Sequence, residues 1–569
     1  MIYKTYLSPG PSPMPRGEPC HFVIYIESIN FTPHFHSFKW GRGAGRYRLV
    51  SIVYFMFLFF FGLSTMSYAF DINDLKVILK VHHRPDFPKP DTKRIPVTLV
   101  PEAGPGTFVA SFGLPFPPDV LYDHTYIRIL DEHNHPIPIF TRPLAQWWLK
   151  DHPASLRSVL VQFEIAFADT LPRTFTLAWD ETRAHVRQQE VPLSETQFIR
   201  QDFDAAFLCP KVLPIVPPDW LCQSGIALQQ VAASQNSVAL WYDQHLIEQF
   251  PGSLTHINAS EFHAHLYDRP ATYAKIYIRH GTREHLLAAL KASAVYRSHL
   301  TPEGFFALKP GDYKYVYAEG SMLLYFLTGD ESFKEAALHT LSSWNTWNRI
   351  QYSGEGFWTE RHTAFGMSAY LSAYQLTGDE RFLLQAKTYF DGVYKLQIAP
   401  LNNKPPDGAW RHTAESHGDG HGWTTSPWMS ALLMDSIWTY WILTNDSRAS
   451  RSMAMYAKFI AQHAITPDGK SLYYMAASAG NGQSVNPENP PHHVEACYML
   501  ALGYYLSGDR DLFAKYNHLW PLVMNDGANS PSRKFSWRFR NTAMLVWFLS
   551  HAEDDDKNQF DHDHKKHHE

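Results

Sequence analysis

Polar residues recur at a fixed distance before five similar turns in the second half of the sequence. The turns read IRHGT (278–282), FLTGD (326–330), QLTGD (375–379), ILTND (442–446) and YLSGD (505–509). Sixteen residues before the Gly or Asn of each turn stand, in order, His265, Tyr313, His362, Met429 and His492. Histidine and tyrosine can donate or accept protons in general acid–base catalysis. The other explanation is that polar side chains cap the starts of helices.

Charged and aromatic residues flank these positions and complete a candidate site. The candidate catalytic residues are His265, Tyr313, Tyr317, His362 and His492, and the candidate substrate-binding residues are Arg269, Glu319, Glu360, Arg361, His421, Trp423, His493 and Glu495. A guanidinium group matches a carboxylate with two parallel hydrogen bonds, so Arg361 or Arg269 would bind the carboxylate of an acidic sugar. Glu360 would serve equally well as a structural partner of Arg361.

Two enzymatic reactions fit these residue types. β-Elimination from a uronic acid needs a base for the C5 proton, a group that neutralises the carboxylate and an acid for the leaving oxygen. Hydrolysis needs two carboxylates at a defined separation, for which the candidates are Glu319, Glu360, Asp419 and Glu495. The bias toward His, Tyr and Arg favours a polysaccharide lyase over a glycoside hydrolase. A glycan-binding protein without catalytic activity is a further alternative.

The segment WRHTAESHGDGHGW (410–423) interrupts the repeat with polar residues of its own. Its interleaved Gly and His residues predict a loop that could close over a cleft. The alternating spacing of His417, Asp419 and His421 is a weak signal for a metal site, so no metal ligand is assigned. A requirement for Ca²⁺ stays open, because backbone carbonyls supply part of its ligands.

The elements that would position these residues are helical hairpins. Each turn follows an apolar helix, such as SAYLSAY, and precedes an amphipathic one, such as ERFLLQAKTYFDGVYKL. A Gly or Asn at the turn suits the left-handed residue that ends many helices. Five hairpins, with RNTAMLVWFL (540–549) as a further helix, predict an (α/α) toroid over residues 261–551. The apolar helices would form its inner ring, with their N-terminal ends facing one common cleft.

The preceding region has the pattern of strands. Over residues 70–180, short runs such as LKVILKV, IPVTLV, YIRIL and SVLVQFEIAF are separated by Pro, Gly, Asn and Asp. Such runs predict a β-barrel or β-sandwich. Residues 181–260 are irregular and contain Pro, so we expect a connector there. The predicted fold class is therefore multidomain β + α, a β-barrel or sandwich followed by an (α/α) toroid.

Three stretches of the β region carry a resemblance: FGLPFPPDVL, YIRILDEHNHPIPIFTRPLAQWW and SLRSVLVQFEI. They resemble the N-terminal barrel of the exo-rhamnogalacturonan lyase family and its relatives, which combine a RIFT-type β-barrel with a six-hairpin (α/α) toroid. The helical region is similar to the toroids of six-hairpin glycosidases and polysaccharide lyases. The resemblance implies a carbohydrate-active enzyme with a polysaccharide or oligosaccharide substrate, and it transfers no catalytic residue.

The N-terminus predicts export. Arg42, Arg46 and Arg48 precede the apolar run LVSIVYFMFLFFFGL (49–63), and Ser67-Tyr68-Ala69 follows it. This is the pattern of a secretory signal peptide cleaved after Ala69. The run is short for a bilayer span, so no stable membrane span is expected after cleavage. We assign residues 1–69 to a signal peptide with a mis-annotated extension, and the mature protein to the periplasm or the extracellular space.

Composition excludes one class of partner. The chain has 50 Lys and Arg against 55 Asp and Glu, which does not indicate nucleic acid binding. Residues 552–569 are rich in His and Asp and lack apolar periodicity, so a disordered tail is expected. Cys209 and Cys222 could form a disulfide in an exported chain or remain reduced packing residues, and both alternatives stay open.

Overall fold

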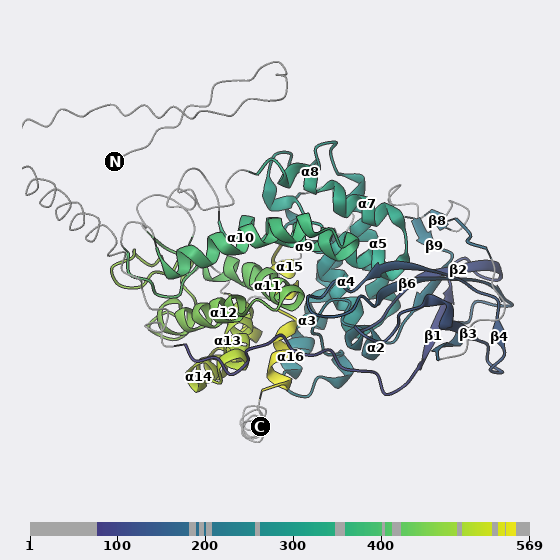
Figure 1. Cartoon of the computed structure of the whole chain (residues 1–569), viewed down its shortest axis with the longest axis horizontal. Coiled ribbons are helices and arrows are strands. Elements are labelled where there is room, and N and C mark those ends of the chain that lie inside the picture. The colour runs from purple at the N-terminus through teal and green to yellow at the C-terminus, as the bar shows by residue number, and fades with distance from the viewer. Residues whose placement is uncertain are drawn as a thin grey trace, which may run out of the picture. The chain divides into compact units, whose positions relative to one another are not determined.

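The computed structural model describes residues 77–180, 189–192, 198–200, 208–256, 262–347, 359–400, 404–411, 423–485, 492–525, 533–540 and 542–552. Figure 1 shows strands in the earlier part of this chain and helices in the later part. The strands are β1 (Arg94–Pro101), β2 (Gly106–Pro115), β3 (Ile127–Leu130), β4 (Pro136–Ile137), β5 (Phe140–Gln146), β6 (Leu156–Phe167), β7 (Arg173–Trp179), β8 (Phe198–Arg200), β9 (Leu208–Pro210) and β10 (Val212–Ile215).

The helices follow from residue 218 onward. They are α2 (Pro218–Gln223), α3 (Leu240–Ser253), α4 (Arg269–His280), α5 (Arg283–Ser298), α6 (Glu319–Thr328), α7 (Glu331–His339), α8 (Leu341–Trp344), α9 (Glu360–Thr377), α10 (Glu380–Ile398), α11 (Pro427–Thr444), α12 (Ser447–Phe459), α13 (His493–Ser507), α14 (Arg510–Leu519), α15 (Arg533–Phe539) and α16 (Met544–Ser550). No described helix is both long and apolar enough to cross a membrane.

Two antiparallel sheets make up most of the β part. One has the strand order β10-β1-β7-β3-β4 and the other the order β2-β6-β5, while β8 and β9 pair separately. Buried and outward-facing residues alternate along β1, as in a strand with one face on the core. The sheets face each other, since the rings of Phe163 (β6) and Phe175 (β7) lie 5.5 Å apart. The described strands thus form the sandwich alternative, and a closed RIFT-type barrel is not seen among them.

Two features at the edges of this β part differ from the sequence expectation. The described residues of LKVILKV (75–81) are not a strand, because their backbone serves a helix end: the amides of Lys80 and Val81 donate to Leu506 O at 2.8 and 3.1 Å. The segment 181–260 contributes to both parts of the fold, since β10 pairs with β1 and α3 packs on α15.

The repeated turns end one helix and start the next. Gly281, Gly329, Gly378, Asn445 and Gly508 are left-handed and end α4, α6, α9, α11 and α13. The side chains of Thr282, Asp330, Asp379, Asp446 and Asp509 then accept hydrogen bonds from backbone amides at the starts of α5, α7, α10, α12 and α14. The predicted left-handed helix ends are therefore confirmed, and the Asp or Thr that follows is the N-cap of the next helix.

The helices form a ring of pairs. Each of α4, α6, α9, α11, α13 and α16 packs against the next in this order, while α5, α7, α10, α12 and α14 pack outside their partners. The ring closes where Met544 of α16 and Lys275 of α4 line one cavity. Helix α3 lies in the outer layer beside this last sector, because the Tyr242 hydroxyl is 3.0 Å from Thr542 Oγ1, just before α16. The described helices therefore form an (α/α) toroid in which α3 is the outer helix near the start of α16.

The sheets cover the ends of the inner helices that carry the turns. At the end of α9, a β-carbon added at Gly378 would lie 2.5 Å from the Trp148 ring. Arg157 of β6 is buried against the Trp147 ring and donates to Gln375 Oε1 of α9 at 2.7 Å. The N-terminal ends of the inner helices therefore lie at the side of the ring away from the sheets.

The cysteines of the described chain are unbridged. Cys209, Cys222 and Cys497 are buried, and none of the three forms a disulfide. Burial raises the pKa of the Cys209 and Cys222 thiols to about 12, so both stay protonated and act as small apolar residues. Cys209 and Cys222 therefore do not form the disulfide that the sequence left open.

Candidate active site

Two of the three polar residues at the start of α9 have structural partners. The amide of Thr359 donates to Nδ1 of His362 at 3.0 Å, which completes a capping box. Glu360 is fully buried, and its Oε1 accepts from Thr425 Oγ1 at 2.9 Å and from the Ser426 amide at 3.0 Å. His362 therefore caps its own helix, and Glu360 ties α9 to the residues that precede α11.

The third residue, Arg361, joins an aromatic group that we call the Arg361 cluster: Tyr267, Arg361, Trp428, His492 and Trp537. Nη1 of Arg361 donates to the Tyr267 hydroxyl at 2.6 Å, and its guanidinium lies 5.8 Å from the Trp428 ring centre. Trp428 packs in turn on Trp537 at 4.8 Å and on His492 at 5.1 Å. Trp537 closes the group at 5.0 Å from Tyr267. One cation, one phenol and one imidazole thus meet among aromatic rings.

The fold brings these residues together at one end of the ring. Arg361 and Trp428 are the second residues of α9 and α11, and His492 directly precedes α13. Tyr267 precedes α4, and Trp537 lies in α15. All five residues are at most 7% exposed. The N-terminal ends of α9, α11 and α13 therefore meet at one place, and the common cleft expected from the sequence stays a prediction.

Charged groups border the cluster. Nδ1 of His492 lies 3.1 Å from Oε1 of the buried Glu495, so a neutral imidazole that donates from Nδ1 keeps Nε2 as its basic nitrogen. Burial and the nearby Arg361 lower the pKa of Lys314. The cluster can therefore attract an anion while it keeps a basic nitrogen.

A buried ion network lies on the inner helices. Lys275 Nζ is 2.7 Å from Glu319 Oε1 and 3.7 Å from Asp435 Oδ2, and Arg540 reaches the same carboxylates at 2.5 and 3.4 Å. Burial alone would raise the pKa of Glu319, but Lys275 and Arg540 bring it below its usual value. Burial raises the pKa of Asp268 to about 6, although Arg540 opposes the shift. Glu319 therefore stays ionised, while Asp268 titrates near neutrality.

A small cavity adjoins this network inside the ring. Its volume is about 20 Å³, and its polar lining includes Lys275, Glu319, Asp435, Gln375 and Thr439. This is space for about one water molecule. It is too small for a sugar, so we place the candidate site at the Arg361 cluster.

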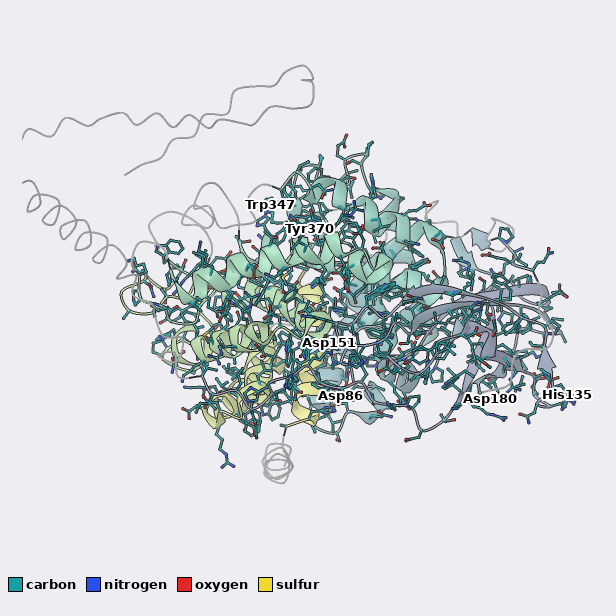
Figure 2. All side chains as sticks on the ribbon, in the orientation of Figure 1. Asp86, His135, Asp151, Asp180, Trp347 and Tyr370 are labelled. Carbon is teal, nitrogen blue, oxygen red and sulfur yellow. The ribbon has the colours of Figure 1, made fainter. Side chains whose placement is uncertain are left out.

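A second aromatic group contains two residues that the sequence proposed as catalytic. The ring of His362 stacks on Trp347 at 5.4 Å, and Tyr313 lies 4.6 Å from the same tryptophan. Tyr370 of α9, labelled in Figure 2 together with Trp347, donates its hydroxyl to Asn345 Oδ1 at 2.8 Å. The Tyr313 hydroxyl bonds Thr346 Oγ1 at 2.7 Å. The structure thus brings His362 and Tyr313 together, but not in the Arg361 cluster.

The other proposed residues are dispersed. His265 packs on Phe306, Tyr317 is buried and donates to Lys314 O, Arg269 donates to Ser253 O, and Glu319 belongs to the ion network. His493 Nε2 lies 2.6 Å from Lys470 O, and the Trp423 amide donates to Asn481 O. His421 and Asp419 lie outside the described residues.

Unequal helix lengths explain why the sixteen-residue count does not define one ring position. Helices α9 and α11 have 18 residues each, whereas α4 has 12 and α6 has 10. His265 and Tyr313 therefore fall in 3-10 turns ahead of their helices, while His362 and Met429 fall inside theirs. Counting from the turn aligns helix ends, not helix starts.

Sequence reasoning missed several residues that the structure places in or beneath the site. Trp428 and Trp537 belong to the Arg361 cluster, and Lys275, Asp435 and Arg540 belong to the ion network. Tyr267 of the cluster is a neighbour of the counted position His265 in the sequence, but it was not among the proposed catalytic residues. A count of seventeen residues before the turn would have paired Trp428 with Arg361. No sequence spacing signals Trp537, because it comes from α15, outside the repeated hairpins.

Comparison with known proteins adds the following findings. The sequence matches no protein-family model and no curated protein. Among solved structures, one titled as a polysaccharide lyase has a TM-score of 0.42 at 12% identity and covers 55% of this chain and 99% of its own. A D-mannose isomerase has a TM-score of 0.40 at 12% identity, with 54% and 97% coverage. A glycosyl hydrolase family 88 protein from Bacteroides vulgatus has a TM-score of 0.41 at 12% identity, with 55% and 100% coverage.

No group of three or more His, Cys, Asp or Glu side chains in the described part of the chain is arranged to hold a metal ion.

Proposed function

We propose that this protein is an exported polysaccharide lyase that cleaves glycans containing uronic acids by β-elimination. The observation that carries the proposal is the contact of Arg361 with Tyr267 at 2.6 Å, in one aromatic group with His492. Elimination needs a carboxylate binder, a base and an acid, and this cluster contains one group suited to each. The export follows from the N-terminal sequence alone.

In the proposed reaction, Arg361 binds the carboxylate of the uronic acid and stabilises the charge that builds on it when C5 loses its proton. Nε2 of His492, whose Nδ1 is held by Glu495, takes that proton. Because Arg361 donates to the Tyr267 oxygen, the phenolic proton is directed elsewhere and can pass to the leaving oxygen. The C4–O bond breaks and a C4–C5 double bond forms, giving one unsaturated sugar and one new reducing end.

Hydrolysis is the second candidate, and one observation favours it. Asp268 has a raised pKa and Glu319 a lowered one, and a pair shifted in opposite directions can divide the roles of acid and base. However, both carboxylates already have partners. Asp268 accepts from the amides of Ala271 and Gly320, and Glu319 pairs with two cations. We therefore rank hydrolysis second.

The test uses the chain from Phe70 with polygalacturonate, alginate, glucuronan, hyaluronan and heparin. Ultraviolet absorbance of unsaturated products is followed together with reducing ends. A lyase raises both signals, and a hydrolase raises reducing ends alone. If neither rises on any glycan, a binding measurement on the same panel tests the non-catalytic alternative.

Two matched variants assign the chemistry. Tyr267→Phe removes the proposed acid and should lower kcat by roughly a hundredfold or more. Tyr370→Phe removes a hydroxyl that donates to Asn345 Oδ1 outside the cluster, and it should leave kcat unchanged. Equal rates for the two variants would remove Tyr267 from the mechanism.

A further inference from the structure

The backbone that carries Tyr267 has an unusual conformation. Tyr267 and Asp268 are consecutive non-glycine residues with φ of 72° and 54°. Each such residue costs of the order of 1 kcal/mol or more, so the surrounding structure must hold it in place. The pair directly precedes α4 and turns the chain so that the Tyr267 hydroxyl meets Arg361.

We call the pair Tyr267–Asp268 the corner. The side chain of Asp268 holds it in place. It is 1% exposed, and its Oδ1 accepts from the Ala271 amide at 3.0 Å as the N-cap of α4. Its Oδ2 accepts from the Gly320 amide of α6 at 3.3 Å. The carboxylate therefore joins the starts of two inner helices. A third bond fixes the corner from the other side, since the Tyr267 amide donates to the Tyr317 hydroxyl at 2.9 Å.

The approach of the two helices depends on a glycine. A β-carbon at Gly320 would lie 2.5 Å from Cβ of Pro270, 2.6 Å from the Ala271 amide nitrogen and 2.8 Å from Oδ1 of Asp268. Any other residue would push α6 away from the corner. The sequence thus supplies both the acceptor, Asp268, and the space in which it reaches α6.

We propose that Asp268 is a positioning residue, which in its ionised form holds the Tyr267 hydroxyl against Arg361 and makes activity depend on pH. The proposal rests on the proposed function only for its catalytic part. An ionised carboxylate accepts both amide hydrogen bonds well, whereas the hydroxyl oxygen of a protonated acid is a poor acceptor. Protonation therefore weakens one of the bonds to α4 and α6, and the corner loses part of its support.

The groups around Asp268 set the pH at which its carboxyl is protonated. The groups that face it are Glu319 at the start of α6, Arg540 after α15, Tyr296 on α5 and Tyr317 before α6. Burial and Glu319 raise its pKa, Arg540 and the two amides lower it, and the result is about 6. Below this pH the carboxyl is protonated and the corner is loosened.

The first experiment needs no substrate. Trp428 and Trp537 contact Tyr267, so tryptophan fluorescence reports on the corner. In the wild type, titration from pH 4.5 to 8 should show a transition near pH 6, reduced in amplitude in Trp537→Phe. Asp268→Asn keeps an N-cap acceptor but cannot titrate, and it should lack the transition. Asp509→Asn, at the N-cap of the outer helix α14, is the matched control and should keep it.

The second experiment measures kcat and KM against pH on the glycan of the panel with the fastest turnover. Asp268→Asn should lose the decline in activity below pH 6 and lower kcat about tenfold with little change in KM, because alignment and not binding is impaired. A decline that persists in Asp268→Asn overturns the proposal, as does a wild type without a fluorescence transition. If no glycan is turned over, the proposed function fails while the fluorescence result still decides the role of Asp268.

A second variant covers the case that Asp268→Asn does not fold. Tyr317→Phe removes the hydroxyl that accepts from the Tyr267 amide and keeps the ring that packs on Phe365. It should lower kcat several-fold with KM unchanged and alter the fluorescence of the folded protein. A Tyr317→Phe variant with wild-type kcat at every pH would show that the corner does not position Tyr267.

Discussion

Nη2 of Arg540 lies 2.5 Å from Oε2 of Glu319, which is 221 positions away in the sequence. Arg540 follows the helix that carries Trp537, and Glu319 begins the inner helix α6. This buried ion pair therefore fixes the last part of the described chain on the ring and keeps Trp537 in the Arg361 cluster.

Arg540→Met should destabilise the fold by about 3–5 kcal/mol, because it leaves Glu319 and Asp435 buried with Lys275 as their remaining cation. Urea unfolding followed by circular dichroism measures the change. Arg381→Met is the control, since Arg381 pairs with Asp379 on the surface, and its unfolding midpoint should match the wild type. A similar midpoint for both variants would mean that the network adds little stability.

Arg361→Lys should lower kcat/KM on the preferred uronic-acid glycan by roughly a hundredfold, because an ammonium group cannot form the paired hydrogen bonds of a guanidinium. Steady-state kinetics on the native glycan and on its carboxyl-reduced form provide the measurement. The carboxyl-reduced form should be a poor substrate for both proteins. The control is Arg173→Lys. Arg173 lies on β7 and pairs with Glu132, and its substitution should leave kcat/KM unchanged. Equal losses from both substitutions would rule out carboxylate binding by Arg361.

Gly378→Ala should destabilise the protein by about 2–4 kcal/mol, since Gly378 has a φ of 71° and a β-carbon there would meet the Trp148 ring. Gly252→Ala is the matched substitution: Gly252 lies in α3, and nothing stands within 4 Å of its added β-carbon. It should leave stability unchanged or raise it by up to about 1 kcal/mol. The midpoints of thermal unfolding of both variants distinguish a glycine required by the turn at Gly378 from an ordinary helical glycine at Gly252.

His245→Gln should make the free energy of unfolding depend less steeply on pH below about 6.5. Burial lowers the pKa of His245 to about 4, so the folded state keeps it neutral while the unfolded chain binds a proton below about pH 6.5. Stability from this group is thus complete above pH 6.5 and is lost as pH falls toward 4, with a slope of up to about 1.4 kcal/mol per pH unit. Urea midpoints between pH 4.5 and 7.5 provide the test. The exposed His133→Gln should reproduce the wild-type curve, and so would His245→Gln if His245 were protonated in the folded protein.

Much of the helical part could be read from the sequence because short-range chemistry determines it. The Gly or Asn of each turn requires a left-handed backbone, and the following Asp or Thr requires an amide to bind, so the turns identify the hairpins. The sequence did not predict that α3 belongs to the ring, because no such turn joins it to α16, which lies nearly 300 residues later in the chain.

The composition of the site was harder to predict, since it depends on where each helix begins. Glu360, Arg361 and His362 are adjacent and equally polar, yet only Arg361 reaches the cluster, while the other two bind Thr425 and Thr359. Which of them joins the cluster depends on contacts with α11 and with Tyr267, which are remote in sequence.

The different lengths of the inner helices have a consequence for how such a protein can change over generations. The turns of α6 and α9 pack on Leu160 and Trp148 of the β part, so a residue added or removed at the start of either helix changes the opposite end of the ring. Helices α4 and α6 are 6 to 8 residues shorter than α9 and α11, a difference of about 9–12 Å in helix length. Insertions or deletions at the start of one inner helix can thus reshape one sector of that end of the ring, while the packing of the turn at the helix's other end is kept.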